Sequence, residues 1–325
     1  MPDSSNIKPS VGSQALGQGR AEGFRAVGGR IDDEVVALAS DPIALRSSVR
    51  ERSRFFTDTV DCGKYKVHVE VVTRSDVHCP TILFVNGALT TTSSLRWAIK
   101  NLVDFNIVGF DFPVFGSSFS LNPHAALITK EQEVEIVTRL CNLYEPEFLF
   151  SFSWGGTSAL LSLTEKPESV RKAIISSYSV GLTKEMRAMA EDLVYLIDAG
   201  DYDSAALVTI DNLGEFLPDK VKRLFRGYFV TLSPQQVQNV VGQIRYMLAL
   251  AAEDELAKLR KIKVPVLFGN GSRDRLTSAG SIRPIEAYVS NCEFAVIEGS
   301  GHFMALEGKQ VCDAACARIR SFFRS

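Results

Sequence analysis

Residues 148–156 read Phe-Leu-Phe-Ser-Phe-Ser-Trp-Gly-Gly, and they are the most informative part of this chain. The apolar run 148–150 predicts a short buried strand, and the residues after it predict a tight turn that opens a helix near Trp154. A serine at such a corner is forced out of the sheet and exposed, as in the Gly-x-Ser-x-Gly nucleophile elbow. Here Ser151 replaces the first glycine, at a position that needs a small side chain because strand and helix cross closely there. Ser153 is therefore the candidate nucleophile.

Two further residues of a nucleophilic site follow predicted strands later in the chain. The apolar run 264–268 ends in a turn that carries Asp274, and the run 294–297 ends shortly before His302. Open α/β sheets place their ligand sites beyond the carboxyl ends of the strands. The order Ser153, Asp274, His302 is also the chain order of an α/β-hydrolase triad. Each residue alone has an ordinary structural explanation, but the order and the three strand ends together favour a triad.

The predicted triad suits nucleophilic acyl transfer. The Ser153 hydroxyl is a weak nucleophile until a base takes its proton, and His302 is the predicted base and general acid. Asp274 is expected to fix the imidazole tautomer and to stabilise the imidazolium. We therefore expect an ester or thioester substrate that passes through an acyl-Ser153 intermediate.

Negative charge on a substrate carbonyl needs preorganised N–H donors. One predicted donor is the backbone N–H of Trp154, the residue after the nucleophile. The other is expected from the loop after the strand 81–85, where Ala88 is the candidate and Leu89 the alternative. In the same loop Gly87 allows the backbone turn, and Asn86 can hydrogen-bond to hold the loop.

Strands alternate with helices from about residue 55 onward, which predicts a mostly parallel sheet covered by helices on both faces. Residues 181–259 break this alternation, because they are helical by period and contain no convincing strand. We expect them to form a helical lid inserted after the sixth strand, over a core formed by residues 51–180 and 260–325. Residues 1–50 have few large apolar side chains and are expected to be a flexible tail.

Composition narrows the possible functions. Of the 325 residues 46% are hydrophobic and 23% are charged, and the formal net charge of -2 gives no indication of nucleic-acid binding. No apolar run approaches the roughly 18 residues that a membrane span requires, and the N-terminus does not resemble a secretory signal. The six cysteines are dispersed, as expected for the reducing cytoplasm. We expect no metal and no cofactor.

Several motifs carry a family resemblance. The loop 85–88, the following Thr91-Thr92, the segments 122–123 and 127–130, the elbow 151–156 and the segment 301–303 resemble two related groups of α/β-hydrolases. One group makes 3-(3-hydroxyalkanoyloxy)alkanoates in the first step of rhamnolipid synthesis. The other comprises the (R)-3-hydroxyacyl-ACP:CoA transacylases of polyhydroxyalkanoate synthesis, also described as acyl-ACP thioesterases.

The resemblance implies an (R)-3-hydroxyacyl thioester of acyl carrier protein (ACP) or CoA as the acyl donor. The acceptor that it implies is another 3-hydroxyacyl group, the CoA thiol or water. By similarity the family's triad falls on Ser153, Asp274 and His302. Two alternatives stay open, a general carboxylesterase and a non-catalytic small-molecule binding protein on the same fold. Intact triad residues argue against the second, since a binding protein does not need all three.

A basic cluster lies in the predicted lid. ACP is acidic, so a cluster of cations is a possible docking surface for it. The other explanation is an ordinary solvated helix face. The cluster comprises Lys220, Lys222, Arg223 and Arg226.

Overall fold

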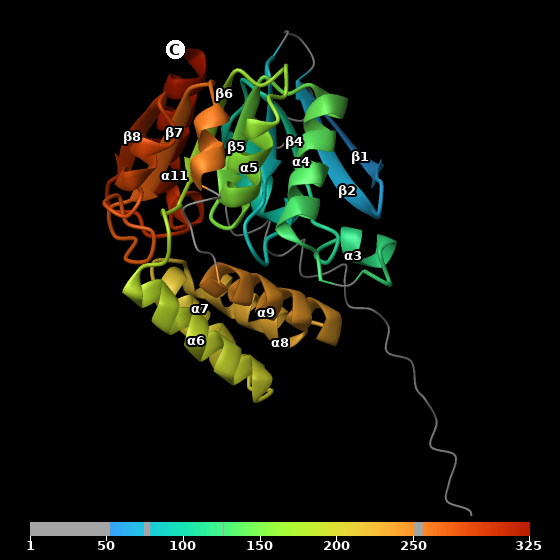
Figure 1. Cartoon of the computed structure of the whole chain (residues 1–325), viewed down its shortest axis with the longest axis vertical. Coiled ribbons are helices and arrows are strands. Elements are labelled where there is room, and N and C mark those ends of the chain that lie inside the picture. Colours follow the sequence, from blue (N-terminus) through green and yellow to red (C-terminus); the bar gives the residue numbers. More distant parts are fainter. Residues whose placement is uncertain (1–52, 75–78, 126, 250–255) are drawn as a thin grey trace, which may run out of the picture.

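The computed structural model of this chain describes residues 53–74, 79–125, 127–249 and 256–325 (Figure 1). The tail predicted for residues 1–50 lies outside these ranges. None of the described helices has the length and apolar character needed to span a membrane.

The described residues form one eight-stranded sheet with the order β1-β2-β4-β3-β5-β6-β7-β8. The first two strands are antiparallel to each other, and β2 is antiparallel to β4. All pairs from β4 to β8 are parallel, which confirms the predicted fold class. The strands are β1 (Ser53–Cys62), β2 (Tyr65–Arg74), β3 (Thr81–Val85), β4 (Asn106–Phe110), β5 (Phe148–Phe152), β6 (Lys172–Ser176), β7 (Val266–Gly271) and β8 (Cys292–Ile297).

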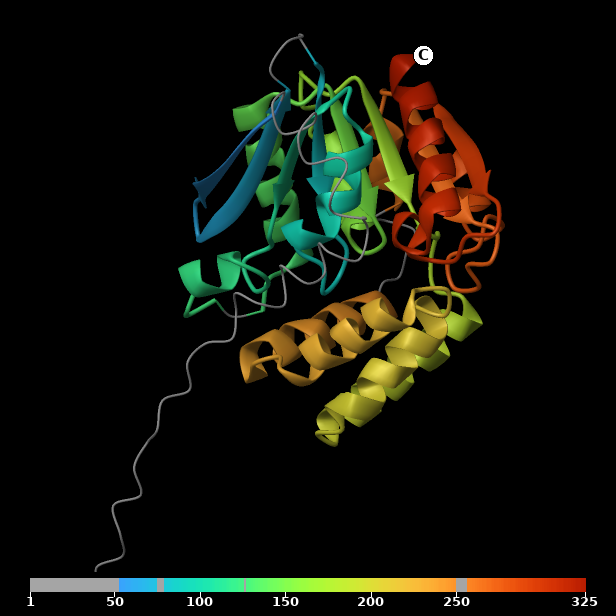
Figure 2. The ribbon, with the colours of Figure 1, turned by 180° about the vertical axis from the view of Figure 1, so that it is seen from behind.

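Helices cover both faces of the sheet. On one face lie α4 (Lys130–Tyr144) and α5 (Gly155–Thr164), in front of the sheet in Figure 1. On the other face lie α2 (Arg96–Asn101) and α11 (Lys309–Arg324), in front in Figure 2. Each face of the sheet carries its own hydrophobic core, and successive strand residues alternate between the two because side chains along a strand point to opposite faces. Leu83 belongs to the core on the side of α4 and α5, and Phe84 to the core on the side of α2 and α11.

Four long α-helices of the described part of the chain lie between β6 and β7 and form a separate layer. They gather beneath the end of the sheet toward which the arrowhead of β6 points (Figures 1 and 2). Side-chain caps begin two of them, since Thr183 accepts from the Met186 N–H at 3.1 Å and Asp201 from the Ser204 N–H at 3.0 Å. The helices are α6 (Lys184–Asp198), α7 (Tyr202–Leu213), α8 (Asp219–Val230) and α9 (Pro234–Ala249).

The helical layer contacts the sheet-bearing core at several places, two of which fix its position over the strands. At one, the ring of Phe216 lies so close to Gly301 that a Cβ on the glycine would be 2.5 Å from it. At the other, buried Asn239 of α9 accepts a hydrogen bond from the Ile128 N–H at 3.0 Å. These contacts seat the layer across the carboxyl ends of the strands, where open α/β sheets bind ligands.

Candidate active site

The turn between β5 and α5 holds Ser153 in a left-handed conformation. Its φ is +50°, in a region that non-glycine residues seldom adopt. The helix that follows approaches β3 so closely that a Cβ on Gly155 would be 2.4 Å from the Asn86 carbonyl oxygen. The turn therefore has the geometry of a nucleophile elbow, with the serine projected beyond the strand end.

Ser151 occupies the position where the elbow motif usually has glycine. Its side chain is fully buried, and its hydroxyl has no hydrogen-bond partner among the described residues. A small residue fits here as predicted, but the hydroxyl oxygen is desolvated without compensation.

The structure brings the three residues of the predicted triad together. His302 Nε2 lies 3.0 Å from Ser153 Oγ, and His302 Nδ1 lies 2.8 Å from Asp274 Oδ2. The histidine is held between aromatic rings, with centroids 5.3 Å from Phe152 and 5.4 Å from Phe303. This geometry is the one that lets an imidazole accept the serine proton while a carboxylate orients the ring. The catalytic role of the three residues stays a prediction.

Asp274 is buried but well supplied with hydrogen bonds. Its Oδ1 accepts from the backbone N–H groups of Leu276 at 3.1 Å and Thr277 at 2.9 Å, and its Oδ2 accepts from the Thr277 hydroxyl. Burial alone would raise the pKa of this carboxyl. The attraction of His302 and the hydrogen bonds outweigh burial and lower the pKa of Asp274 to about 2. The Asp274 carboxyl is therefore ionised at neutral pH and can accept a hydrogen bond from His302 Nδ1.

Glu307 supports the histidine and was not singled out from the sequence. Its carboxylate accepts from the Gly301 N–H at 2.6 Å and from the Phe303 N–H at 2.8 Å. These two amides flank His302, so the carboxylate fixes the loop on both sides of the ring. Burial raises the pKa of Glu307 despite these bonds. An acidic residue shortly after the histidine is common, and only the folded loop shows that it turns back.

The loop after β3 lies beside the nucleophile, as expected for the second oxyanion donor. Asn86 is buried and donates to the Phe110 carbonyl at 2.8 Å, so it anchors the loop to β4. A Cβ on Gly87 would be 3.1 Å from the Phe152 carbonyl oxygen. The backbone N–H groups of Ala88 and Trp154 donate to no acceptor among the described residues. They remain our candidates for the oxyanion hole.

A buried ionic network lies behind the elbow, and its contacts are not predicted by the sequence. Lys130 and Glu133 of α4 form an ion pair, with side chains 2% and 1% exposed. The Lys130 ammonium lies 3.8 Å from the centroid of the Trp154 ring. Glu133 Oε1 accepts from Trp154 Nε1 at 3.1 Å and from Gln243 Nε2 of α9 at 3.4 Å. The residue after the nucleophile is thereby tied both to α4 and to the helical layer.

A cavity of about 210 Å³ opens at the triad, between the core and the helical layer. Ser153, His302, Trp154 and Ala88 line it from the core. Its other walls are mostly apolar, and roughly 150 Å³ of apolar cavity is enough to bind benzene in an engineered protein. The space therefore suits an extended aliphatic chain. The apolar residues from the helical layer include Met186, Met189, Leu193, Phe225, Phe229 and Met247.

Comparison with known proteins agrees with this geometry. Residues 80–309 match the family described as alpha/beta hydrolase fold. The chain belongs to the α/β-hydrolase family. This hydrolase is 35% identical over 253 residues to the (R)-3-hydroxydecanoyl-ACP:CoA transacylase of Pseudomonas putida, covering 77% of this chain and 85% of that protein. It is 34% identical over 264 residues to the enzyme of the same name from Ectopseudomonas oleovorans, covering 81% and 89%.

Solved structures resemble this α/β-hydrolase in fold. An α/β-hydrolase enzyme from a Medee basin deep-sea metagenome library superposes with a TM-score of 0.69 at 16% identity, covering 82% of this chain and 98% of its own. The enol-lactonase of Burkholderia xenovorans LB400 superposes with a TM-score of 0.67 at 14% identity, covering 82% and 100%. At these identities the likeness concerns the fold alone.

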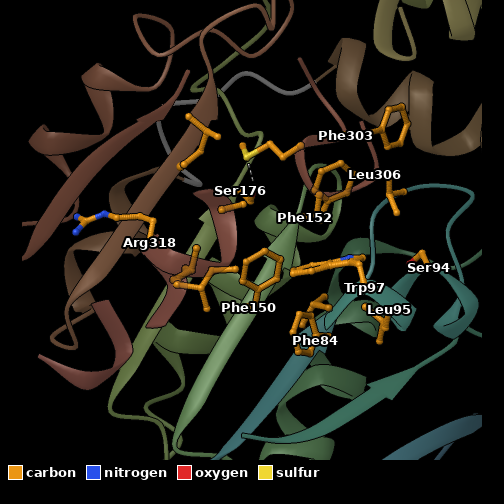
Figure 3. Close-up of a pocket in the computed structure, with 18 of the residues that line it drawn as sticks. Phe84, Ser94, Leu95, Trp97, Phe150, Phe152, Ser176, Phe303, Leu306 and Arg318 are labelled. Atoms are coloured by element: carbon orange, nitrogen blue, oxygen red, sulfur yellow. Dashed lines mark hydrogen bonds between the residues drawn. The ribbon is translucent and has the colours of Figure 1, made fainter. Parts of the chain in front are cut away.

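A second, smaller cavity of about 80 Å³ lies in the hydrolase core, between the sheet and the layer of α2 and α11 (Figure 3). Phe150, Phe84 and Trp97 line it. Phe152 and Phe303 line both cavities and form part of the wall between them. Because no residue of the predicted triad lines this cavity, we place the chemistry in the larger one.

The basic cluster predicted from the sequence lies on α8, and two of its members have local partners. Arg226 forms an exposed ion pair with Asp203, and Lys222 Nζ donates to the Glu215 carbonyl at 2.7 Å. Lys220 and Arg223 are exposed. The cluster is thus partly committed to the helical layer itself, and a docking role stays a prediction.

Proposed function

We propose that the protein transfers the acyl group of an (R)-3-hydroxyacyl thioester through an ester on Ser153. The observation that carries this proposal is the contact of His302 Nε2 with Ser153 Oγ at 3.0 Å, at the mouth of a largely apolar cavity. Relatives also support the proposal. Three proteins named (R)-3-hydroxydecanoyl-ACP:CoA transacylase are 30–35% identical to this chain over 77–81% of its length.

The chemistry follows from the geometry. Ser153 Oγ attacks the thioester carbonyl carbon while its proton passes to His302 Nε2. The Ala88 and Trp154 N–H groups stabilise the oxyanion, and ionised Asp274 stabilises the imidazolium. The carbon–sulfur bond then breaks, and the departing thiol takes the proton from His302. An acceptor next attacks the carbonyl carbon of the acyl-serine and gives its own proton to His302 Nε2. The ester bond to Ser153 Oγ then breaks, His302 returns the proton to Oγ, and the acceptor leaves with the acyl group.

We propose the CoA thiol as the acceptor and the ACP thioester as the donor. The names of the relatives support this pair. Transfer from one thioester to another is nearly balanced in energy, so the enzyme has to exclude water from the acyl-serine. The helical layer, which closes over the apolar cavity, suits that requirement. We also infer that the protein works in the cytoplasm, where such carriers and free thiols are kept.

The test is the mass of the products formed from (R)-3-hydroxydecanoyl-ACP with and without CoA. We expect 3-hydroxydecanoyl-CoA when CoA is present, and an acyl-enzyme mass on Ser153 when it is withheld. Ser153→Ala should remove both, because among the described residues the hydroxyl in contact with His302 Nε2 is that of Ser153. Free acid or a dimeric hydroxyacyl ester with CoA present would instead show water or a second acyl group as acceptor. Turnover of simple esters without any turnover of thioesters would refute the proposal.

A further inference from the structure

The polar side chains that line the large cavity are mostly occupied by partners within the protein. The hydroxyl groups of Thr157 and Tyr178 bond to each other at 3.2 Å. The Thr209 hydroxyl donates to the Ala205 carbonyl at 2.9 Å, and the Ser177 hydroxyl donates to the His302 carbonyl at 2.7 Å. Such groups are satisfied without a ligand.

Gln243 is different. It lines the cavity from α9, its side chain is buried with the residue only 6% exposed, and its Oε1 has no hydrogen-bond partner among the described residues. A buried acceptor without a donor is costly, and native proteins seldom keep one without a use.

The orientation of this amide is fixed by Glu133. The carboxylate is paired with Lys130, so it can only accept hydrogen bonds. The Gln243 group that faces Glu133 Oε1 must therefore be the NH2, at 3.4 Å. The amide oxygen is left as the free acceptor of a residue that lines an otherwise largely apolar cavity.

The position of Gln243 suits a group close to the reacting carbonyl. Its NH2 and the indole N–H of Trp154 share the same carboxylate oxygen, and Trp154 directly follows Ser153. In a 3-hydroxyacyl thioester the hydroxyl is two carbons from the carbonyl that Ser153 attacks. A residue that recognises this hydroxyl must therefore lie near the nucleophile.

We infer that Gln243 Oε1 accepts a hydrogen bond from the 3-hydroxyl group of the acyl chain and selects 3-hydroxyacyl over unsubstituted acyl substrates. This inference rests on the proposed function, because it names the substrate group that the same site recognises. The oxygen has almost no exposed surface, so a neighbouring side chain must shift to admit the hydroxyl. Met247 lies one turn further along α9 and lines the same cavity, and methionine adapts readily.

The first test compares kcat/KM for (R)-3-hydroxydecanoyl and decanoyl thioesters of one carrier. We expect the wild-type protein to prefer the hydroxyacyl substrate by about tenfold or more, since a site built to bond a hydroxyl rejects the analogue that lacks it. Gln243→Met should bring the ratio close to one, mainly by loss on the hydroxyacyl substrate. It should also remove discrimination between (R) and (S) chains. If Gln243 had a purely structural role, Gln243→Met would lower kcat/KM equally for both substrates. That result would overturn the inference.

The matched control is Gln238→Met, the same change at an exposed position of α9, which should leave the ratio as in the wild type. Thr157→Val tests whether the hydroxyl pair of Thr157 and Tyr178 recognises the 3-hydroxyl group instead. If Thr157→Val and not Gln243→Met abolishes the preference, the assignment to Gln243 is wrong.

The second test does not depend on turnover. In a Ser153→Ala background, calorimetry should show (R)-3-hydroxydecanoate binding about tenfold more tightly than decanoate, and Gln243→Met should remove the difference. Equal binding of the two acids would overturn the inference even if acyl transfer is observed. If the Ser153→Ala protein binds the hydroxy acid selectively but the wild-type protein turns over no thioester, the role of Gln243 is supported and the proposed reaction is contradicted.

Discussion

Asp274 shows how the surroundings of a buried side chain decide its charge. Burial opposes its charge, but the attraction of His302 and the hydrogen bonds from His302 and Thr277 reverse that effect and lower the pKa of Asp274. The same hydrogen bonds that keep the carboxylate ionised also hold the turn after β7. The aspartate is thus ready for the histidine before any substrate arrives.

This arrangement predicts how stability depends on pH. The pKa of Asp274 is about 2 in the folded protein, below its ordinary 3.8. A depressed folded pKa contributes stability that is present above the unfolded pKa and lost as the pH falls through the folded one. We expect about 2 kcal/mol of the free energy of unfolding to disappear between about pH 4 and pH 2. Urea unfolding at a series of acidic pH values measures this.

The control for this prediction is Asp274→Asn, which removes the titrating group and keeps its shape. The variant should be less stable than the wild type at neutral pH, and the difference should shrink as the pH falls. If the difference stays constant down to pH 2, the carboxylate does not contribute to stability in this way.

At the scale of elements, α8 places its cations unequally. Arg226 is paired with Asp203 and Lys222 bonds to the Glu215 carbonyl, while Lys220 and Arg223 are exposed. If an acidic carrier docks here, the exposed pair should contribute most to the encounter.

We therefore predict that Lys220→Glu with Arg223→Glu lowers kcat/KM for an ACP-bound substrate by about tenfold at low salt, with a smaller effect as salt rises. Turnover of a small activated ester should be unchanged, because the cavity is untouched. The control, with the same change of charge, is Lys64→Glu with Lys66→Glu on exposed positions of the β1–β2 hairpin. Equal losses for the carrier-bound substrate in both double variants, or equal losses for ester and carrier substrate, would contradict a docking role.

Most elements that position the site could be predicted from the sequence. The helix expected to open near Trp154 is α5, and the strands before Ser153, Asp274 and His302 lie where their apolar runs indicated. These predictions succeed because local apolar patterns and glycines are read within a few residues.

Features that depend on tertiary register were not predictable. The position of β4 between β2 and β3 depends on crossover connections, which no local pattern encodes. The contact of Glu133 with Gln243 joins residues 110 positions apart. In the sequence both residues look like ordinary polar positions of amphipathic helices. The unbonded hydroxyl of Ser151 is likewise visible only once its neighbours are in place.

In the described part of the molecule, the helical layer and the sheet-bearing core are joined by several contacts. Phe216 packs against Gly301 of the histidine loop, and Asn239 bonds to Ile128 ahead of α4. Gln243 adds a further contact, next to the indole of Trp154. The helical layer is therefore in direct contact with the loop of His302 and with Trp154, the residue after Ser153, so changes in the layer can alter the site itself as well as access to it.

The separation of Ser153 and His302 by 149 positions has a consequence for refolding. Helices form locally and quickly, but parallel strands from β5 to β8 pair only after long chain closures, which are slow. During recovery from denaturant, far-ultraviolet circular dichroism should return before esterase activity does, and a fluorophosphonate probe should label Ser153 only in the late phase. Simultaneous recovery of all three signals would mean that the helices also wait for the sheet. The time at which Ser153 becomes reactive toward the probe would thus report when the last strand pairs with the sheet.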